Sequence, residues 1–317
     1  MLRFIVVRIG GMVPLLLVIT ASVFLLGQYG AGDLAMTLTM RLNDNQFDQQ
    51  LYDTMVHKLH QDESPLARFG LFVTDAVHGD FGVSYVLPGT PDIGRMIAAS
   101  LPISLQLGLV AMMMVVAVGV PLGVLAAAAR NSFPDYIVVG GSTVLSSVPP
   151  FVLAPIALVA LVAELHVIPT VSTGWHGMFS RETVLPAAIL ACGPMLGIVR
   201  YTRASVVDVL SQEYVRAARA RGLAESQVIT RHIIKNSMTP VLTVMGISMA
   251  RLLSGSIFVE AVFGVQGLGN VAVTAFQSGD IQTVAACTLV TALIVMLSNL
   301  LVDLLYGMLD PRVRISA

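Results

Sequence analysis

Long apolar segments recur along this sequence and restrict the folds open to it. Soluble cores do not contain apolar segments of this length, whereas about twenty apolar residues in a helix span a bilayer. Only 12% of the residues are charged, against roughly a quarter in soluble domains. The sequence therefore predicts an all-α polytopic membrane protein with six transmembrane helices. Its apolar segments are 9–26, 101–129, 136–165, 184–199, 241–265 and 284–309, of which 184–199 needs flanking residues to span.

The first apolar segment follows two arginines, as the hydrophobic part of a signal peptide would. No small-residue cleavage site stands out after it, so we expect a retained transmembrane helix. A polar insert separates this segment from the second and carries more carboxylates than basic side chains. We expect a small folded insert, helical over 46–59, with turns near Pro65, Gly79 and Pro88.

Basic residues are concentrated in alternate connections between the spans. Because arginine and lysine mark cytoplasmic loops, we expect both termini and the basic loop inside the cell and the acidic insert outside. Twelve of the eighteen basic residues lie on the predicted inner side: Arg3, Arg8, Arg130, Arg200, Arg203, Arg216, Arg219, Arg221, Arg231, Lys235, Arg312 and Arg314.

Residues 211–240 form a polar, basic interruption between two apolar segments. On a helix, Tyr214, Ala217, Ala218 and Arg221 are spaced i, i+3, i+4 and i+7, so they share one face. Two alanines on that face permit close contact with another protein, and the tyrosine offers an amphipathic anchor. The alternative is a loop whose charges only set the membrane topology, but topology does not require this order of alanines and glycine.

The ends of this loop helix also have sequence signals. Asp208 or Ser211 is expected to cap its start, and Gly222 is placed to end it in the left-handed conformation. We expect a second helix over 225–237, with Pro240 opening the next span.

Small residues and prolines indicate how the spans pack. Gly119 and Gly123, and likewise Gly193 and Gly197, have the GxxxG spacing that lets helices approach closely in lipid. Prolines within the spans predict ordinary kinks, or a break that lines a water-filled path.

Several segments resemble one family of membrane proteins. Residues 217–222 resemble the EAA motif of permease subunits of bacterial ATP-binding-cassette (ABC) importers, with Arg216 in place of the motif's glutamate. The string 213–223, followed by Arg231, His232 and Asn236, is similar to the oligopeptide, dipeptide and nickel branch. Further matching segments are 61–66, 78–84, 263–264, 267–269 and 310–312.

The resemblance implies a type I importer permease fold in the bacterial cytoplasmic membrane. It implies a first helix with its extracytoplasmic insert over 1–97, a five-helix core over 98–308 with the coupling loop at about 205–238, and a cytoplasmic tail over 309–317. The coupling loop would dock on an ATPase subunit. The residues expected there are Glu213, Tyr214, Arg216, Ala217, Ala218, Arg221 and Gly222.

The implied partners are a second homologous permease subunit, one or two ABC ATPase subunits and an extracytoplasmic peptide-binding protein, with no nucleic acid. Short peptides are the expected cargo, with nickel and haem as alternatives.

No cofactor is expected in this chain, because ATP and magnesium would be bound by the ATPase. The sequence contains no G-x-x-x-x-G-K-[ST] loop, so a separate subunit must hydrolyse ATP and this chain is not an enzyme.

A charge inside the fifth span requires an explanation. Arg251 there costs on the order of 3 kcal/mol unless it is compensated. It is therefore expected to line the transport pathway, or to pair with Asp303 or with a residue of the second permease subunit. A proton-coupled secondary transporter is the rival class, but it would show repeats and midplane carboxylates. The candidate pathway residues are Ser147, Pro149, Ser248, Arg251 and Ser254.

Five of the six histidines fall on the predicted outer side. His57 and His60 share a helical face with Asp53, which would suit a metal or haem contact. A solvated surface helix explains them as well, and no second ligand pair has a diagnostic spacing.

Overall fold

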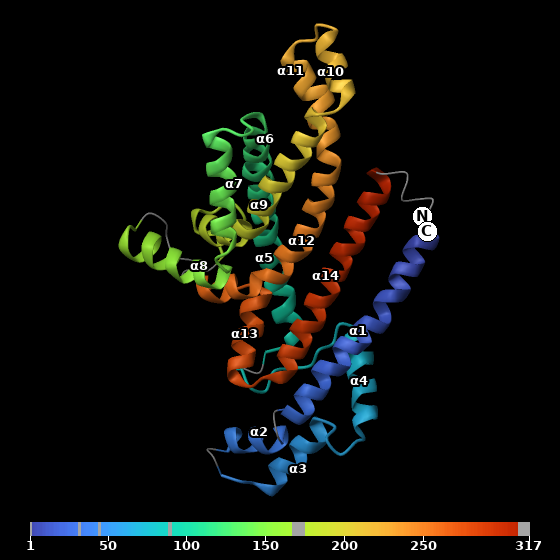
Figure 1. The fold of residues 1–317 in the computed structure, drawn as a ribbon. Helices are drawn as coiled ribbons and strands as arrows, with labels where there is room; N and C mark the ends of the chain where they lie inside the picture. The colour runs from blue at the N-terminus through green and yellow to red at the C-terminus, as the bar shows by residue number, and fades with distance from the viewer. Residues whose placement is uncertain (1, 31–32, 44–45, 88–90, 167–174, 310–317) are drawn as a thin grey trace. The chain divides into compact units, whose positions relative to one another are not determined.

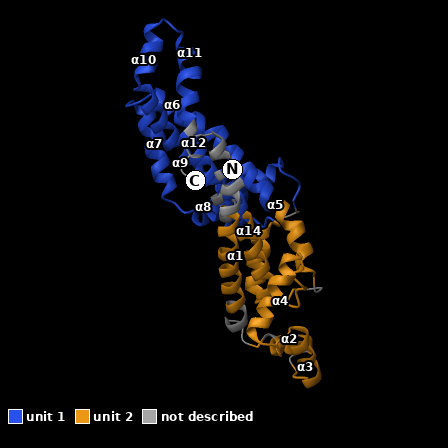
Figure 2. Ribbon diagram, turned by 90° about the vertical axis from the view of Figure 1, so that its right-hand side faces the viewer, with its two compact units in different colours: residues 1, 103–265, 295–317 blue, residues 2–102, 266–294 orange. Residues whose placement is uncertain are grey.

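The computed structural model describes residues 2–30, 33–43, 46–87, 91–166 and 175–309, which are predominantly helical (Figure 1). Its contacts divide the chain into two units, each made of segments distant in sequence (Figure 2). Unit 1 contains residues 103–265 and the segment from 295 onward. Unit 2 contains residues 2–102 and 266–294.

The predicted polytopic membrane fold is confirmed. Within the described ranges, four helical stretches are long and apolar enough to span a membrane: Arg8–Leu25, Ile93–Ala128, Arg181–Leu210 and Ile281–Val302. Two bent helix pairs raise the number to six if each pair crosses as one span. The helices carrying the four stretches are α1 (Leu2–Gly30), α5 (Ile93–Met114) continued by η1 (Val115–Gly119) and α6 (Val120–Ala128), α9 (Arg181–Leu210) and α14 (Ile281–Leu309).

The predicted third span, 136–165, is not one straight helix. It divides into α7 (Phe133–Ser146) and α8 (Pro150–Ala157), which continues as the π-helical segment η2 (Leu158–Glu164). The two parts are bent by 97°. The bend follows from Pro149, whose backbone is extended with ψ 145°, and from Pro150, because neither residue has an N–H to continue the helical hydrogen bonding.

The other bent pair involves a helix that was not predicted. Residues 241–265 lie in α12 (Lys235–Phe263), which ends at Gly264 in the left-handed conformation, with φ 67°. After this break comes α13 (Leu268–Ser278). Gly279, with φ 74°, ends α13 before α14 begins.

Three short helices form the insert in unit 2. The expected helix over 46–59 is confirmed as α3 (Gln49–Lys58), and α2 (Leu34–Leu42) precedes it. Pro65 begins α4 (Pro65–Val77) instead of forming a turn, because proline suits the first helical turn and Ser64 caps it by accepting the Ala67 N–H. Gly79 makes the expected turn with φ 78°, and Pro88 lies outside the described residues.

The first GxxxG pair packs two helices of unit 1 together. A Cβ on Gly123 would lie 2.6 Å from Thr202 Cβ and 2.7 Å from the Val199 carbonyl oxygen of α9. Gly119 is also close to α9, because its Cβ would lie 3.2 Å from the Met195 carbonyl oxygen. The close approach of α6 and α9 therefore depends on these glycines. For the second pair, Gly193 and Gly197, no described atom lies within 4 Å of where a Cβ would stand, so this pair packs no helix of the described chain.

This packing predicts a difference between two Gly→Ala substitutions. Gly123→Ala is expected to destabilise the chain by about 1–3 kcal/mol, because the added methyl group forces α6 away from α9. Gly140→Ala in α7 is the matched control, since no described atom lies within 4 Å of its Cβ position. Unfolding of the purified variants in a denaturing detergent series measures both. Equal stability of the two variants would contradict the packing.

Candidate functional site

The basic loop of unit 1 folds as a short helix packed on the ends of longer ones. Helix α10 (Glu213–Ala220) follows α9 after two connecting residues. Its inner face places Val215 and Ala218 in a small core with Val206, Val228 and Ile233. Helix α10 is thus fixed to unit 1 by apolar packing as well as by its chain connections.

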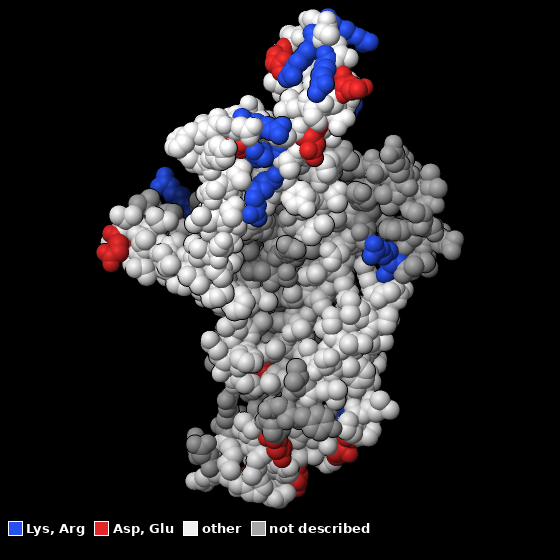
Figure 3. Space-filling model, viewed as in Figure 1, with Lys and Arg blue, Asp and Glu red and all other residues white. Residues whose placement is uncertain are grey.

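The opposite face of α10 is open to solvent. We define the α10 outer face as Glu213, Tyr214, Arg216, Ala217 and Arg221, all of which are exposed. Figure 3 shows Lys and Arg side chains together with carboxylates over the α10 and α11 end of unit 1. Tyrosine and arginine are enriched at protein contact surfaces, and this face presents one tyrosine and two arginines.

One residue expected on this face lies on the other side. Ala218 is only 5% exposed, whereas Tyr214 is 42% exposed. The i, i+4 spacing places both on one broad side of the helix, but Ala218 also lies three residues from Val215 and turns inward with it. The small Ala218 side chain therefore allows α10 to pack closely on its own chain.

The helix ends differ in part from the expectation. Gln212 precedes the first turn, and its side chain makes no capping hydrogen bond. The expected cap Ser211 instead donates its hydroxyl to the Asp208 carbonyl oxygen at 2.7 Å, at the end of α9. Gly222 takes the expected left-handed conformation with φ 75°, and its N–H bonds the Arg219 carbonyl oxygen at 2.9 Å.

The second helix of the loop does not stop at 237. It begins as α11 (Glu225–Gln227), continues through the π-helical segment η3 (Val228–Ile234) and runs directly into α12. Pro240 lies inside α12 and does not open a new helix. The second helix of the basic loop and the following span therefore form one continuous helical element.

Polar contacts hold α10 against this second helix. Arg219 donates two hydrogen bonds to the Glu225 carboxylate, at 2.6 and 3.1 Å. The hydrogen bond from Arg219 lowers the pKa of Glu225, so this contact is present at neutral pH and is lost as the pH falls through the lowered pKa. Asn236 also donates to the Tyr214 hydroxyl oxygen at 3.1 Å, which orients that side chain.

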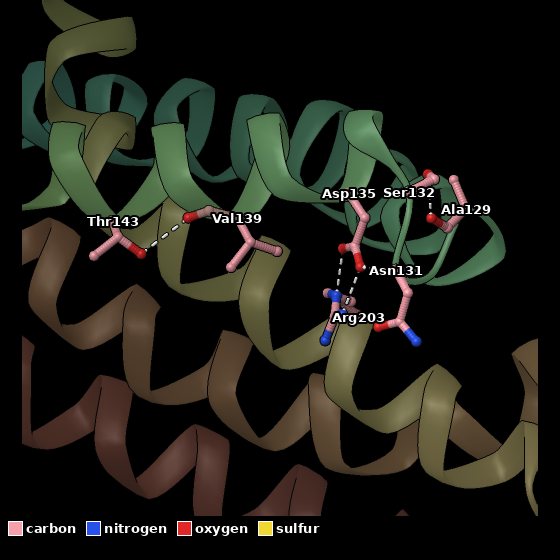
Figure 4. Close-up of polar contacts among 7 residues, drawn as sticks. All are labelled: Ala129, Asn131, Ser132, Asp135, Val139, Thr143 and Arg203. Atoms are coloured by element: carbon pink, nitrogen blue, oxygen red, sulfur yellow. Dashed lines mark hydrogen bonds and ion pairs between the residues drawn. The ribbon is translucent and has the colours of Figure 1, made fainter.

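An ion pair that the sequence did not predict joins α7 to α9 (Figure 4). The Arg203 guanidinium donates to both Asp135 carboxylate oxygens, from Nε at 2.5 Å and from Nη2 at 2.6 Å. The Asn131 backbone N–H also donates to this carboxylate, at 2.9 Å. The partners are 68 residues apart in sequence. The only sequence signal for this pair is Asp135 itself. It is an aspartate at the start of an apolar segment, near the predicted cytoplasmic side, which is rich in arginine.

The predicted pathway residues are dispersed along two structural elements. Ser147 and Pro149 lie at the exposed break between α7 and α8, where the Ser147 hydroxyl bonds the Thr143 carbonyl oxygen at 2.9 Å. Ser248 is buried in α12 and bonds the Val244 carbonyl oxygen at 2.8 Å. Arg251 and Ser254 also belong to α12, but their side chains, like that of Asp303, lie outside the described part of the structure.

The insert histidines bond neighbouring carboxylates. His57 Nδ1 lies 2.8 Å from Asp62, and His60 Nδ1 lies 3.2 Å from Glu63. Asp53 accepts a hydrogen bond from Gln49 at 2.9 Å. Over the ranges that the structure describes, no three histidine, cysteine or acidic side chains are grouped as a metal site.

The fold is that of a type I importer permease. It resembles a chain of the inward-facing MetNI methionine ABC transporter with a TM-score of 0.56 and 16% identity, covering 68% of this chain and 97% of that one. It also resembles a chain of an amino acid ABC transporter solved with histidines, with a TM-score of 0.51 and 18% identity over 69% and 94% of the two chains. At these identities the likeness concerns the fold alone.

Sequence comparison places the chain in a family. The model of the family described as "Binding-protein-dependent transport system inner membrane component" matches residues 119–315. Full-length relatives include the oligopeptide transport system permease protein AppB of Bacillus subtilis, 33% identical over 95% of this chain and 96% of that protein. The glutathione transport system permease protein GsiC of Escherichia coli K12 is 33% identical over 99% of both chains. The chain belongs to this family of multi-pass inner membrane permeases.

Proposed function

We propose that this chain is the permease subunit of an ATP-driven importer of short peptides. The supporting observation is full-length similarity to peptide permeases. Besides AppB and GsiC, the dipeptide transport system permease protein DppB of Bacillus subtilis is 32% identical over 99% of both chains. These relatives favour a peptide importer over the alternatives of nickel or haem cargo and of a proton-coupled transporter.

The α10 outer face is the proposed docking surface for an ABC ATPase subunit. It is exposed, while the inner face of the same helix is buried by Val215 and Ala218. A force applied to α10 is therefore transmitted to α9 and to the continuous α11–α12 element. ATP and magnesium would be bound by the ATPase, and a second permease subunit and an extracytoplasmic binding protein would complete the importer.

The proposed topology places the α10 loop and both termini in the cytoplasm and the insert outside. Its support is the excess of basic residues on one side of the spans. A single cysteine in place of Gln50 is expected to react with a membrane-impermeant maleimide in intact cells. One in place of Ser226 is expected to react only after the cells are permeabilised, although both positions are exposed. Labelling of both positions from outside would contradict the topology.

The cargo is tested by reconstitution with the partner subunits in proteoliposomes. A labelled short peptide is expected to accumulate when ATP is supplied, and unlabelled peptides are expected to compete. Arg251→Gln is expected to slow uptake more than it reduces assembly, because this side chain is proposed to meet a peptide carboxylate in the pathway. Uptake of nickel or haem, with peptides neither transported nor competing, would replace the peptide assignment while retaining the importer class.

A further inference from the structure

Unit 2 contains a cavity of about 540 Å³ that is separate from the α10 outer face and from the pathway residues. Its walls come from α1, α4 and the start of α14, together with the end of α3 and the segment after α4. Sites for small ligands commonly have volumes of about 300–1,000 Å³. The cavity is thus large enough for a polar headgroup or a small molecule.

Two apolar spans reach their ends at this cavity. Phe24 of α1 lines it and lies two residues before Leu26, where the apolar segment 9–26 ends. Ile281, another lining residue, is the first residue of the α14 span. The cavity therefore lies at the depth where hydrocarbon gives way to lipid headgroups, whichever side of the membrane it faces.

The apolar lining lies beside two basic side chains. Phe24 packs edge-on against Phe69 of α4, with ring centroids 5.5 Å apart. The Arg68 guanidinium lies over the Phe24 ring at 5.9 Å, an arrangement that keeps its charge at the membrane boundary. Lys58, at the end of α3, is the second basic residue of the lining. Among the described residues, neither Lys58 nor Arg68 forms an ion pair with a carboxylate, so both charges are available to a ligand.

Carboxylates belong to the same lining. The backbones of Asp75 and Asp80 are adjacent there, because the Asp80 N–H donates to the Asp75 carbonyl oxygen at 2.9 Å. One Asp80 carboxylate oxygen accepts the Gly82 N–H at 2.9 Å. Asp92 is a third acidic residue of the lining. The lining thus contains basic and acidic side chains as well as apolar ones.

We propose that this cavity binds the headgroup of a phosphatidylethanolamine-type lipid. The phosphate would contact Lys58 and Arg68, the primary ammonium would donate hydrogen bonds to Asp75 and Asp80, and the acyl chains would follow α1 into the bilayer. A headgroup with a phosphate but no ammonium would meet three carboxylates without a compensating cation. A choline headgroup carries the positive charge but has no N–H to donate.

Native mass spectrometry of the full-length chain, released from detergent with defined lipids, tests this site. Phosphatidylethanolamine is expected to be retained about tenfold more than phosphatidylcholine or phosphatidylglycerol at equal concentration. The double variant Lys58→Gln/Arg68→Gln is expected to lose this preference. Arg95→Gln is the matched control, because Arg95 is an exposed basic residue of the same unit that does not line the cavity.

Several outcomes would overturn the proposal. Preference for phosphatidylglycerol would indicate only attraction to basic residues, and an equal loss in Arg95→Gln would indicate a nonspecific charge effect. Displacement of the lipid by a short peptide would assign the cavity to substrate. A photoactivatable phosphatidylethanolamine used with the unaltered chain provides a test that does not depend on how the variants fold. It is expected to label the segment 58–85, and labelling confined to other segments would contradict the site.

Discussion

Replacing Gly222 by valine is expected to abolish transport while the chain still inserts into the membrane. Gly222 follows α10 with φ 75°, a conformation that is strained for a β-branched residue. No described atom lies within 4 Å of a Cβ built on Gly222, so the cost arises from the backbone and not from a clash. Relief of that strain would turn α10, and its outer face would no longer fit the proposed ATPase partner.

Gly222→Asn is the matched control for this prediction. Asparagine also adds a side chain into open space, but it is among the residues that adopt the left-handed conformation most readily. Transport and co-purification of the ATPase subunit are therefore expected to survive in Gly222→Asn and to be lost in Gly222→Val. Full activity in both variants would show that the α10 orientation does not matter for coupling. Loss of membrane insertion in Gly222→Val would attribute the effect to folding instead.

Breaking the ion pair between α7 and α9 is expected to have the largest effect on stability. The Asp135 side chain is 2% exposed and the Arg203 side chain 26% exposed. Removing one member of a buried pair costs about 3–5 kcal/mol, because an uncompensated charge remains. Arg203→Gln is expected to cost more than Asp135→Asn, since the arginine that remains in the latter variant still reaches water whereas the isolated aspartate does not.

Unfolding of the purified variants in a denaturing detergent series measures this effect, and a double variant tests its cause. Asp135→Asn/Arg203→Gln is expected to be more stable than Arg203→Gln alone, because the buried carboxylate is removed with its partner. Arg200→Gln is the control, an exposed arginine of the same helix, and is expected to change stability by less than about 0.5 kcal/mol. Equal effects of Arg200→Gln and Arg203→Gln would contradict a specific pair.

The membrane fold could be predicted because bilayer thickness imposes a length on each apolar helix. The segment 184–199 was too short, and α9 completes it by extending to Arg181 and Leu210. The bend at Pro149 is harder to predict from the sequence. Proline in the sequence marks a possible break, but the 97° angle depends on how the two helices pack. Helix α13 is not predicted from the sequence, because it is a short helix between glycine-containing turns.

The loop illustrates a second limit of sequence reasoning. The order of residues correctly predicted a helix ended by Gly222, since helix termination is a local property. Which side of α10 faces its own chain depends on contacts with Val206, Val228 and Ile233. The residue spacing alone therefore assigns Ala218 to the outer face, whereas it is buried on the inner one. The pairing of Asp135 with Arg203 also depends on tertiary packing and has no local signal.

The energy source for uptake tests the proposed function most directly. The purified chain is reconstituted with its partner permease, ATPase and binding-protein subunits, and accumulation of a labelled short peptide is measured under two driving forces. The account predicts accumulation with ATP inside the proteoliposomes and none with an imposed proton gradient alone. Accumulation driven by the proton gradient in the absence of ATP would contradict an ABC importer permease.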